Sequence, residues 1–279
     1  MPKVAAIQMC SSPDLAENLA MAENLIREAA QNQANLVVLP ENFACMGLNE
    51  ADKLRLREVY QKGPIQDFLS SQAKKNRLWL VGGTIPLQGQ DPEKARAASL
   101  VFDDRGRCVA RYDKIHLFDV SVTETEIYQE SKVIEPGTEL SLVSSPVGKL
   151  GLAVCYDLRF PELFRCLFNQ GAEIFTLPSA FTVKTGQAHW EVLTRSRAIE
   201  NLAYFIGPGQ GGKHAGGRNT YGHSLIIDPW GKILAEKKDV EAGIIFADID
   251  LSYLAQLRQA LPMAKHQRIF SSLKNGGTL

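Results

Sequence analysis

Residues 149–162 read KLGLAVCYDLRFPE, and the rest of the chain can be interpreted outward from them. The stretch opens as a short apolar run, which is typical of a buried strand. Pro161 suits the first turn of a helix because its φ is fixed and it has no N–H to leave unpaired. The apolar residues of 162–170 then recur at helical spacing, and Gly171 is placed to end that helix. Cys155 is therefore expected at the carboxyl end of a central strand, directly before a helix.

A cysteine at this position has two interpretations, and the stretch alone leaves both open. The carboxyl ends of strands are where α/β proteins place reacting groups, and a thiol there can act as a nucleophile. The alternative is a small buried hydrophobe, which is what most free cysteines are.

Length and composition favour one large α/β domain that needs no disulfide or metal to hold it. The chain has 279 residues, 45% of them hydrophobic, and 31 basic residues balance 31 acidic ones. Without runs of like charge, neither a nucleic-acid nor a membrane partner is expected.

The five scattered cysteines form no CxxC pair, so neither a disulfide framework nor a zinc site is expected. With no signal-like or membrane-spanning run, we expect a cytoplasmic protein, and a mitochondrial location stays open.

Hydrophobic periodicity indicates strands, helices and hairpins in alternation. Strands are expected at residues 3–9, 36–39, 78–84, 173–177, 203–206 and 243–249. Helices are expected at residues 15–32, 54–76 with an interruption at 63–64, 189–201 and 251–260. Hairpin turns are expected at residues 103–106, 145–148 and 228–231. Hairpins mixed with β-α-β units favour an α/β fold of stacked mixed sheets with helices outside.

Two long connections and the tail lack these patterns. Residues 117–138 form an acidic, polar segment, and a loop of that length inside a compact domain is usually functional. Residues 207–221 are glycine-rich and are expected to form a mobile surface loop, because their spacing is not that of a phosphate-binding fingerprint. The tail from Ser271 is expected to be disordered.

Three polar residues each follow directly on an expected strand: Glu41, Lys114 and Cys155. If those strands are neighbours, the three side chains converge at one sheet edge. Glu41 would then serve as general base for the thiol, and the Lys114 ammonium would favour the thiolate and hold an oxyanion. The backbone N–H of Tyr156 is a second candidate oxyanion donor. Such acyl transfer needs no metal or organic cofactor; taken singly, Glu41 and Lys114 would be ordinary solvated charges.

Three segments, residues 39–41, 112–117 and 151–162, resemble the signature segments of the nitrilase (carbon–nitrogen hydrolase) superfamily. They occur in that superfamily's order, and the resemblance covers about residues 3–270 of what we take as a single domain, residues 1–279.

This resemblance implies a Glu–Lys–Cys triad at Glu41, Lys114 and Cys155, acting through a thioester intermediate. It also implies a four-layer α-β-β-α sandwich with two mixed sheets, which forms homodimers through outer helices. Members of the superfamily often carry a second glutamate between the lysine and the cysteine, and Glu130 matches that segment. The alternative for Glu130 is a solvated loop carboxylate.

A narrower resemblance involves residues 178–181, 185–193, 221–224 and 228–231. They are similar to a nitrilase-like branch that cleaves the amide of deaminated glutathione, giving 2-oxoglutarate and cysteinylglycine in metabolite repair. The sister branch, the ω-amidases, acts on α-ketoglutaramate and usually has glycine where this chain has Ser179. Both imply a small amide substrate that bears carboxylates. A catalytically silent scaffold is a further alternative, against which the intact triad argues.

Candidate substrate-binding residues follow from position and chemistry. Arg159 could clamp a substrate carboxylate in a fork geometry or form an ion pair within its own segment. Ser179, Ala180 and Phe181 come from the branch-specific segment and are pocket-wall candidates.

Other basic residues leave two questions open. Lys213, His214 and Arg218 could meet a second, distal carboxylate or could be solvated.

A papain-like pairing of the thiol with His189 or His223 is a third mechanistic alternative, although the local papain signature is absent.

Overall fold

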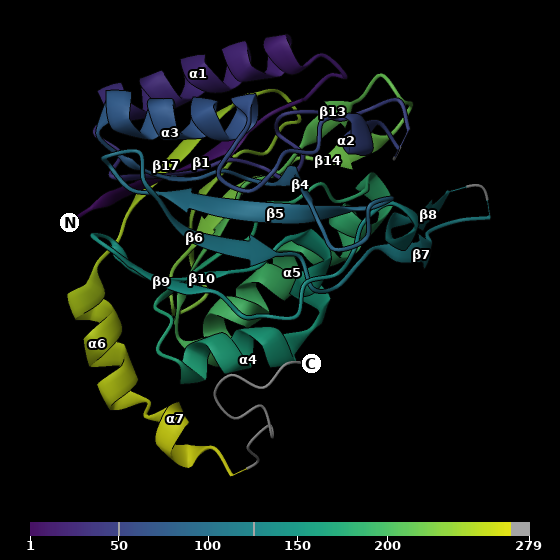
Figure 1. Ribbon diagram of the computed structural model, residues 1–279. Coiled ribbons are helices and arrows are strands. Elements are labelled where there is room, and N and C mark those ends of the chain that lie inside the picture. The colour runs from purple at the N-terminus through teal and green to yellow at the C-terminus, as the bar shows by residue number, and fades with distance from the viewer. Residues whose placement is uncertain (50, 125, 269–279) are drawn as a thin grey trace.

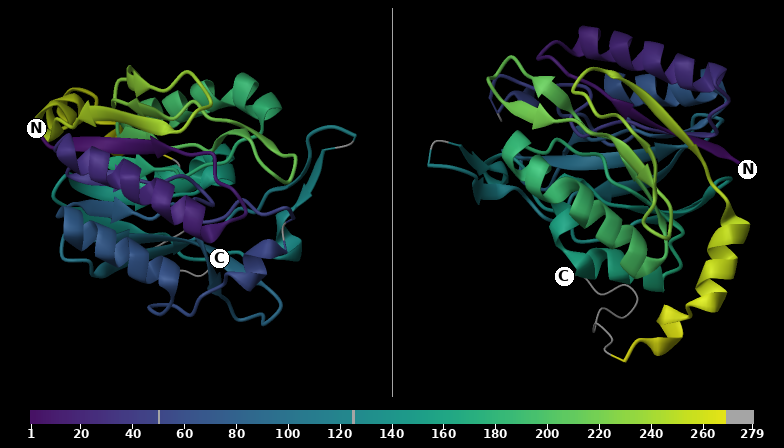
Figure 2. Two further views of the ribbon diagram at one scale, coloured as in Figure 1. Left: turned by 90° about the horizontal axis from the view of Figure 1, so that it is seen from above. Right: turned by 180° about the vertical axis from the view of Figure 1, so that it is seen from behind.

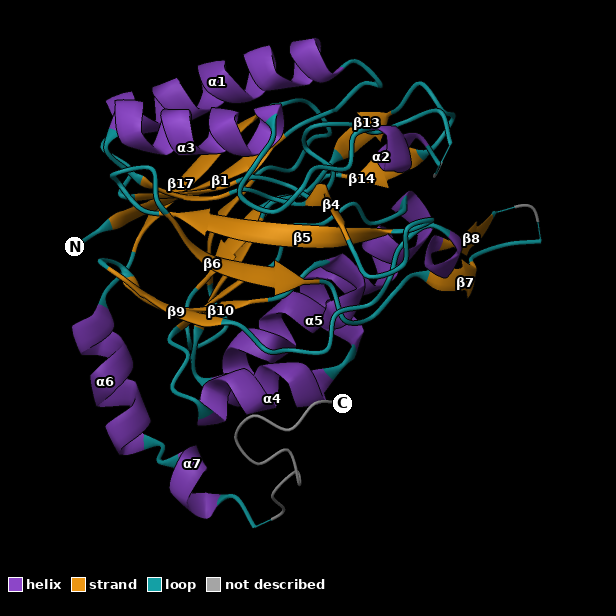
Figure 3. Ribbon diagram, viewed as in Figure 1, coloured by secondary structure: helices purple, strands orange, loops and turns teal. Residues whose placement is uncertain are grey.

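A computed structural model describes residues 1–49, 51–124 and 126–268, and two stacked mixed sheets form its centre (Figure 1). Helices α1 (Leu15–Gln31) and α3 (Pro64–Asn76) cover the outer face of one sheet. Helices α4 (Pro161–Asn169) and α5 (Val183–Asn201) cover the outer face of the other (Figure 3). The expected four-layer α-β-β-α sandwich is therefore confirmed.

The first sheet has three parallel strands at its centre and antiparallel strands at both ends. β1 pairs with β2 and β2 with β3 in parallel, whereas β17 joins β1 and β5 joins β3 antiparallel. The order is β17 (Gly243–Asp248), β1 (Lys3–Gln8), β2 (Leu36–Val38), β3 (Trp79–Val81), β5 (Ala95–Phe102) and β4 (Ile85–Gln88), with β6 (Cys108–Asp113) also paired to β5.

The second sheet repeats this arrangement. β10, β11 and β12 run parallel, and antiparallel strands extend the sheet on either side. Its order is β16 (Ile233–Glu236), β15 (Leu225–Ile227), β12 (Tyr204–Gly207), β11 (Ile174–Thr176), β10 (Gly148–Leu152) and β9 (Leu142–Ser145).

Successive residues of the central strands face opposite sides, and both sides are buried. In β1, Val4 and Ala6 pack into the cluster between the sheets, while Ala5 and Ile7 pack toward α1 and α3. Because side chains alternate with a period of two, a strand covered on both faces must be apolar throughout. This explains why the central strands appear in the sequence as unbroken apolar runs.

Short elements connect and border the two sheets. They are α2 (Asp52–Arg55), β7 (Asp119–Ser121), β8 (Ile127–Gln129), the 3₁₀ turn η1 (Glu130–Lys132), the 3₁₀ turn η2 (Cys155–Arg159), β13 (Gly211–Lys213), β14 (Asn219–Tyr221), α6 (Leu251–Ala260) and α7 (Met263–His266). The β7–β8 hairpin projects beyond the sheets in both views of Figure 2. Within the described residues, no helix combines the length and apolar character needed to cross a membrane.

Several expected elements differ in detail from the structure. The helix expected at 54–76 is divided into α2 and α3, because Gly63 has a φ of 150° and Pro64 begins α3. The segment 117–138 contains the β7–β8 hairpin and η1. The expected tail from Ser271 lies outside the described residues.

The expectation of a mobile surface loop at residues 207–221 is wrong for most of the segment. Residues 207–211 are buried, and β13 pairs with β14 to form a hairpin. Buried His214 fixes that hairpin through hydrogen bonds to the Ser11 carbonyl and the Thr220 hydroxyl, at 2.9 and 2.7 Å. His214 is therefore a structural residue, not a ligand for a substrate carboxylate.

Helix α5 begins earlier than its apolar periodicity indicated, at Val183, because the Thr182 hydroxyl caps its first turn. Its Gly186 lies against Tyr221 of β14, and a Cβ added there would be 2.3 Å from the Tyr221 Cγ. Gly186 therefore sets how closely α5 approaches the hairpin beside the site described below.

We expect Gly186→Ala to lower the thermal unfolding midpoint. Alanine is ordinarily preferred to glycine in a helix by about 1 kcal/mol. A loss of stability on Gly186→Ala would therefore report the close contact of this position with Tyr221. Exposed Gln187→Ala is the matched control and should leave the midpoint nearly unchanged. A midpoint raised by Gly186→Ala would contradict the packing described for α5.

Candidate active site

Glu41, Lys114 and Cys155 converge between the two sheets. Glu41 follows β2, Lys114 follows β6, and Cys155 is the first residue of η2 after β10. β2 and β6 belong to the first sheet and are not adjacent, whereas β10 belongs to the second. The sequence suggested that the three side chains share one sheet edge, and this expectation is wrong. They meet because the two sheets are stacked.

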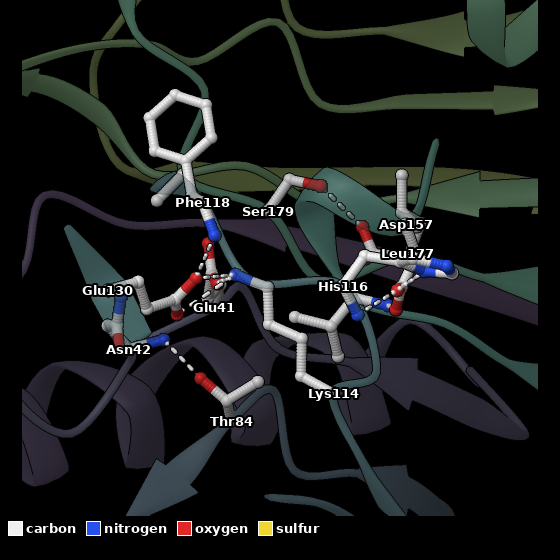
Figure 4. Close-up of polar contacts among 12 residues, drawn as sticks. Glu41, Asn42, Thr84, Lys114, His116, Phe118, Glu130, Asp157, Leu177 and Ser179 are labelled. Carbon is white, nitrogen blue, oxygen red and sulfur yellow. Dashed lines mark hydrogen bonds and ion pairs between the residues drawn. The ribbon is translucent and has the colours of Figure 1, made fainter. Parts of the chain in front are cut away.

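The Lys114 ammonium lies between two carboxylates (Figure 4). Its Nζ is 2.9 Å from Glu41 Oε1 and 2.8 Å from Glu130 Oε2, and all three side chains are buried. Glu130 Oε2 also accepts the Phe118 backbone N–H at 2.7 Å. Glu130 is thus part of the buried ion-pair network, which excludes the alternative of a solvated loop carboxylate.

These contacts determine the charge states. Burial alone would lower the pKa of Lys114, but Glu130 and Glu41 raise this pKa well above its usual value. Burial raises the pKa of Glu41, yet the Lys114 ammonium outweighs this and the net shift is downward. At neutral pH the ammonium and the Glu41 carboxylate are therefore both ionised. Their pairing stabilises the fold at neutral pH. The stabilisation is lost as the pH falls through the lowered pKa of Glu41, or as the pH rises through the raised pKa of Lys114.

Cys155 occupies a strained turn in which its thiol lies beside Glu41. Its φ is 47°, in the left-handed region that non-glycine residues rarely adopt, and its N–H donates to the Pro178 carbonyl at 2.9 Å. Burial, and then the charge of Glu41, raise the pKa of the thiol, and Lys114 opposes them. The sulfur is within hydrogen-bonding reach of the Glu41 side chain and the Ala180 N–H. At neutral pH the site therefore holds a neutral thiol next to an ionised base.

Tyr156 is the second residue of η2, and it lines the same pocket. The first N–H groups of a helical turn have no partner within that turn, so the Tyr156 N–H is available to an oxygen in the pocket. Together with the Lys114 ammonium, it provides the kind of donor pair that an oxyanion requires.

Buried Asp157 joins the segment carrying Lys114 to the turn carrying Cys155. Its carboxylate accepts the Tyr112 hydroxyl at 2.7 Å, the Val154 N–H at 2.8 Å and the His116 N–H at 3.1 Å. The His116 ring lies 2.7 Å from the same carboxylate (Figure 4). Asp157 therefore positions two of the converging residues without touching the pocket itself.

Glu41 is held by close backbone packing. Its carbonyl accepts the buried Gln210 side chain at 3.0 Å, and the Asn42 N–H donates to the Thr84 hydroxyl at 2.8 Å. Gly83 has a φ of 56°, and a Cβ there would lie 2.1 Å from the Pro40 carbonyl oxygen. Only glycine fits this position, so the residues before Glu41 have little freedom to shift.

The pocket around the thiol combines polar side chains with aromatic walls. Its lining comprises Glu41, Asn42, Lys53, Lys114, Phe118, Tyr128, Glu130, Cys155, Tyr156, Ala180, Phe181, Thr185 and Arg218. The cations Lys53, Lys114 and Arg218 outnumber the two carboxylates among these described lining residues. The pocket therefore favours an anionic ligand.

Two of the four expected substrate-binding residues line this pocket, namely Ala180 and Phe181. Ser179 is buried behind it, where its hydroxyl donates to the Leu177 carbonyl at 3.0 Å (Figure 4). Arg159 is not among the lining residues: its guanidinium stacks 5.7 Å from the rings of Tyr156 and Phe181. In this structure Arg159 and Ser179 support the pocket wall.

No histidine lines the described part of the pocket. His189 lies 3.3 Å from Arg159, and the His223 ring faces Glu236 at 3.2 Å. The papain-like alternative therefore lacks its base. Among the described residues, no group of three or more His, Cys, Asp or Glu side chains is arranged to hold a metal ion.

The sequence reasoning missed several lining residues, above all Lys53, Phe118 and Tyr128. Lys53 belongs to the short α2, which the periodicity did not separate from the following helix. Phe118 and Tyr128 lie in the long segment expected to be functional, and aromatic residues within so polar a loop were the signal that could have identified them.

The geometry describes a buried thiol, a base and an ammonium of the kind used in acyl transfer, and the comparisons agree with this chemistry. Residues 3–259 match the carbon-nitrogen hydrolase family, and the chain belongs to that family. A solved structure, Saccharomyces cerevisiae Nit3, described as a member of branch 10 of the nitrilase superfamily, is 35% identical with a TM-score of 0.86. The match covers 96% of this chain and 97% of that one.

Within the family, several similar curated proteins are named deaminated glutathione amidase. The protein of that name from Yersinia enterocolitica is 40% identical over 272 residues, 97% of this chain and 94% of its own. The Homo sapiens protein is 43% identical over 272 residues, 96% of this chain and 83% of its own.

Proposed function

We propose that this chain is a cysteine-dependent amidase whose substrate is deaminated glutathione, the amide of 2-oxoglutarate with cysteinylglycine. The observation that carries the proposal is the meeting of Cys155, Glu41 and Lys114 in one pocket whose lining has excess positive charge. The substrate bears two carboxylates, and relatives of about 40% identity over nearly the whole chain carry the corresponding name.

In the first half-reaction, the Cys155 sulfur attacks the amide carbon while Glu41 accepts the thiol proton. The carbonyl oxygen becomes an oxyanion, which the Lys114 ammonium and the Tyr156 N–H stabilise. Glu41 then returns the proton to the departing nitrogen as the C–N bond breaks. The products of this half are a free amine and a thioester on Cys155.

In the second half-reaction, Glu41 accepts a proton from a water molecule that attacks the thioester carbon. The C–S bond breaks, the proton returns to the sulfur, and the carboxylic acid leaves. Glu130 does not transfer a proton in this scheme; it holds the Lys114 ammonium in place and keeps its charge balanced.

We also propose that the chain, residues 1–279, acts as one domain in a reducing compartment, the cytoplasm. The described cysteines, Cys10, Cys45, Cys108, Cys155 and Cys166, are all free thiols in the structure. A catalytic thiol must stay reduced to act, which a reducing compartment ensures.

A homodimer through the outer helices is part of the proposal. Val192 and Ile199 lie seven residues apart on α5, which places them on one face, and their exposed fractions are 64% and 44%. Trp230, 59% exposed, belongs to the loop that contacts Ile199 through Gly231. Large apolar side chains gathered on one outer face are typical of an interface.

The catalytic proposal is tested with Cys155→Ala and with Cys166→Ala, a matched loss of another buried thiol. Cys155→Ala should abolish hydrolysis of deaminated glutathione while the circular dichroism spectrum stays that of the wild type. Cys166→Ala should retain turnover. Full activity in folded Cys155→Ala would refute the mechanism, and a kcat/KM that is higher for α-ketoglutaramate would move the assignment to ω-amidase.

The dimer is tested by sedimentation of Val192→Glu and, as a control, Val59→Glu, which charges another exposed apolar position. A charge at the centre of an apolar interface opposes association, so Val192→Glu should sediment as a monomer. Val59→Glu should sediment like the wild type. A monomeric wild type, or an unchanged Val192→Glu dimer, would exclude this interface.

A further inference from the structure

A second hollow adjoins the catalytic pocket. This groove has a volume of about 1040 Å³, and its lining includes Glu126, Tyr128, Lys184, Lys213 and Arg218. Tyr128 and Arg218 line the catalytic pocket as well. The two hollows therefore share this pair of side chains as a common wall.

Arg218 and Tyr128 form a fixed boundary between the two hollows. The Arg218 guanidinium donates to the Ala180 carbonyl at 2.6 Å, and it lies 4.9 Å from the centre of the Tyr128 ring. Ala180 is the residue whose N–H reaches the Cys155 sulfur. Arg218 thus connects the β13–β14 hairpin, the β7–β8 hairpin and the nucleophile in one packed arrangement.

The groove is locally positive in a chain whose net charge is zero. Among its described lining residues, three side chains are cationic and Glu126 is the one carboxylate. The Glu126 carboxylate accepts the Tyr128 hydroxyl at 2.8 Å. Lys184 donates one N–H to the Val122 carbonyl at 3.0 Å, which leaves two of its three donors for other acceptors.

The proposed substrate is long enough to extend from the catalytic pocket into the groove. Once the scissile carbonyl is at Cys155, the 2-oxoglutarate portion and the cysteinylglycine portion extend in different directions from it. An extended dipeptide spans about 7 Å, so its terminal carboxylate lies well away from the sulfur. Beyond the Tyr128–Arg218 boundary, the groove offers Lys184 and Lys213 to a carboxylate at the end of such a leaving group.

We propose that this groove, through Lys184 and Lys213, is the leaving-group subsite of the enzyme and binds the terminal carboxylate of a dipeptide-like amine. The inference rests on the amidase function proposed above and adds the residues that select a long substrate over a short one. A charge-assisted pair formed with the leaving group improves binding of deaminated glutathione and cannot form with α-ketoglutaramate, which has no such group.

The test compares three amides on the full-length enzyme and on the Lys184→Met/Lys213→Met double variant. The amides are deaminated glutathione, its C-terminal glycinamide, which lacks the terminal charge, and α-ketoglutaramate. The double variant should lose roughly tenfold in kcat/KM for deaminated glutathione, mainly through KM. The wild type should lose a similar factor when given the glycinamide, and the double variant should distinguish the glycinamide from the acid only weakly.

Lys75→Met, on α3 and outside the lining of the groove, is the control for loss of one surface ammonium and should behave like the wild type. An unchanged preference for the acid over the glycinamide in the double variant would overturn the subsite. An equal loss on all three amides would overturn it as well, since the lysines would then affect the whole site. No hydrolysis of any amide by the wild type would overturn the amidase function and, with it, this inference.

Discussion

One ammonium group shared by two carboxylates is the interaction on which the site depends. Burying an ion between two sheets costs several kcal/mol, and only close, hydrogen-bonded partners offset that cost. Lys114 has those partners in Glu41 and Glu130, at 2.9 and 2.8 Å. The trio carries one net negative charge, and ionising the adjacent thiol would add a second. Burial, and then the charge of Glu41, raise the pKa of the Cys155 thiol against the opposing effect of Lys114.

In the proposed reaction, the net charge of the site does not change when the thiol attacks the substrate. When the thiol proton passes to Glu41, the negative charge leaves the carboxylate and appears on the substrate oxygen beside Lys114. The site therefore stabilises the transition state without exposing an unpaired charge, and the donors are already oriented before substrate arrives. The stacked sheets make this possible, because they hold Glu41 and Lys114 from one sheet against Cys155 from the other.

The sequence predicted the layers and the converging residues because both leave local signals. Apolar strands ending in Pro40-Glu41 and Val154-Cys155 place side chains at strand ends, and the segment resemblance supplied the remaining role, Glu130. The pairing of strands into sheets leaves no local signal in the sequence. The sequence pattern therefore did not indicate that β2 and β10 lie in different sheets. The contacts of Asp157 and the placement of Arg159 and Ser179 outside the pocket likewise depend on tertiary packing. Buried residues 207–211 were misjudged because glycine content is a guide to backbone freedom and not to exposure.

The most direct measurement is the free energy of unfolding, by denaturant at pH 7, of three proteins: the wild type, Lys114→Met, and Lys114→Met combined with Glu41→Gln and Glu130→Gln. Removing the ammonium alone leaves two buried carboxylates unpaired, and the account predicts a loss of roughly 3–5 kcal/mol. Neutralising both carboxylates in the same chain should restore at least about half of that loss. A loss of under about 1 kcal/mol in Lys114→Met, or no recovery in the combined variant, would contradict a shared buried ammonium as the organising interaction.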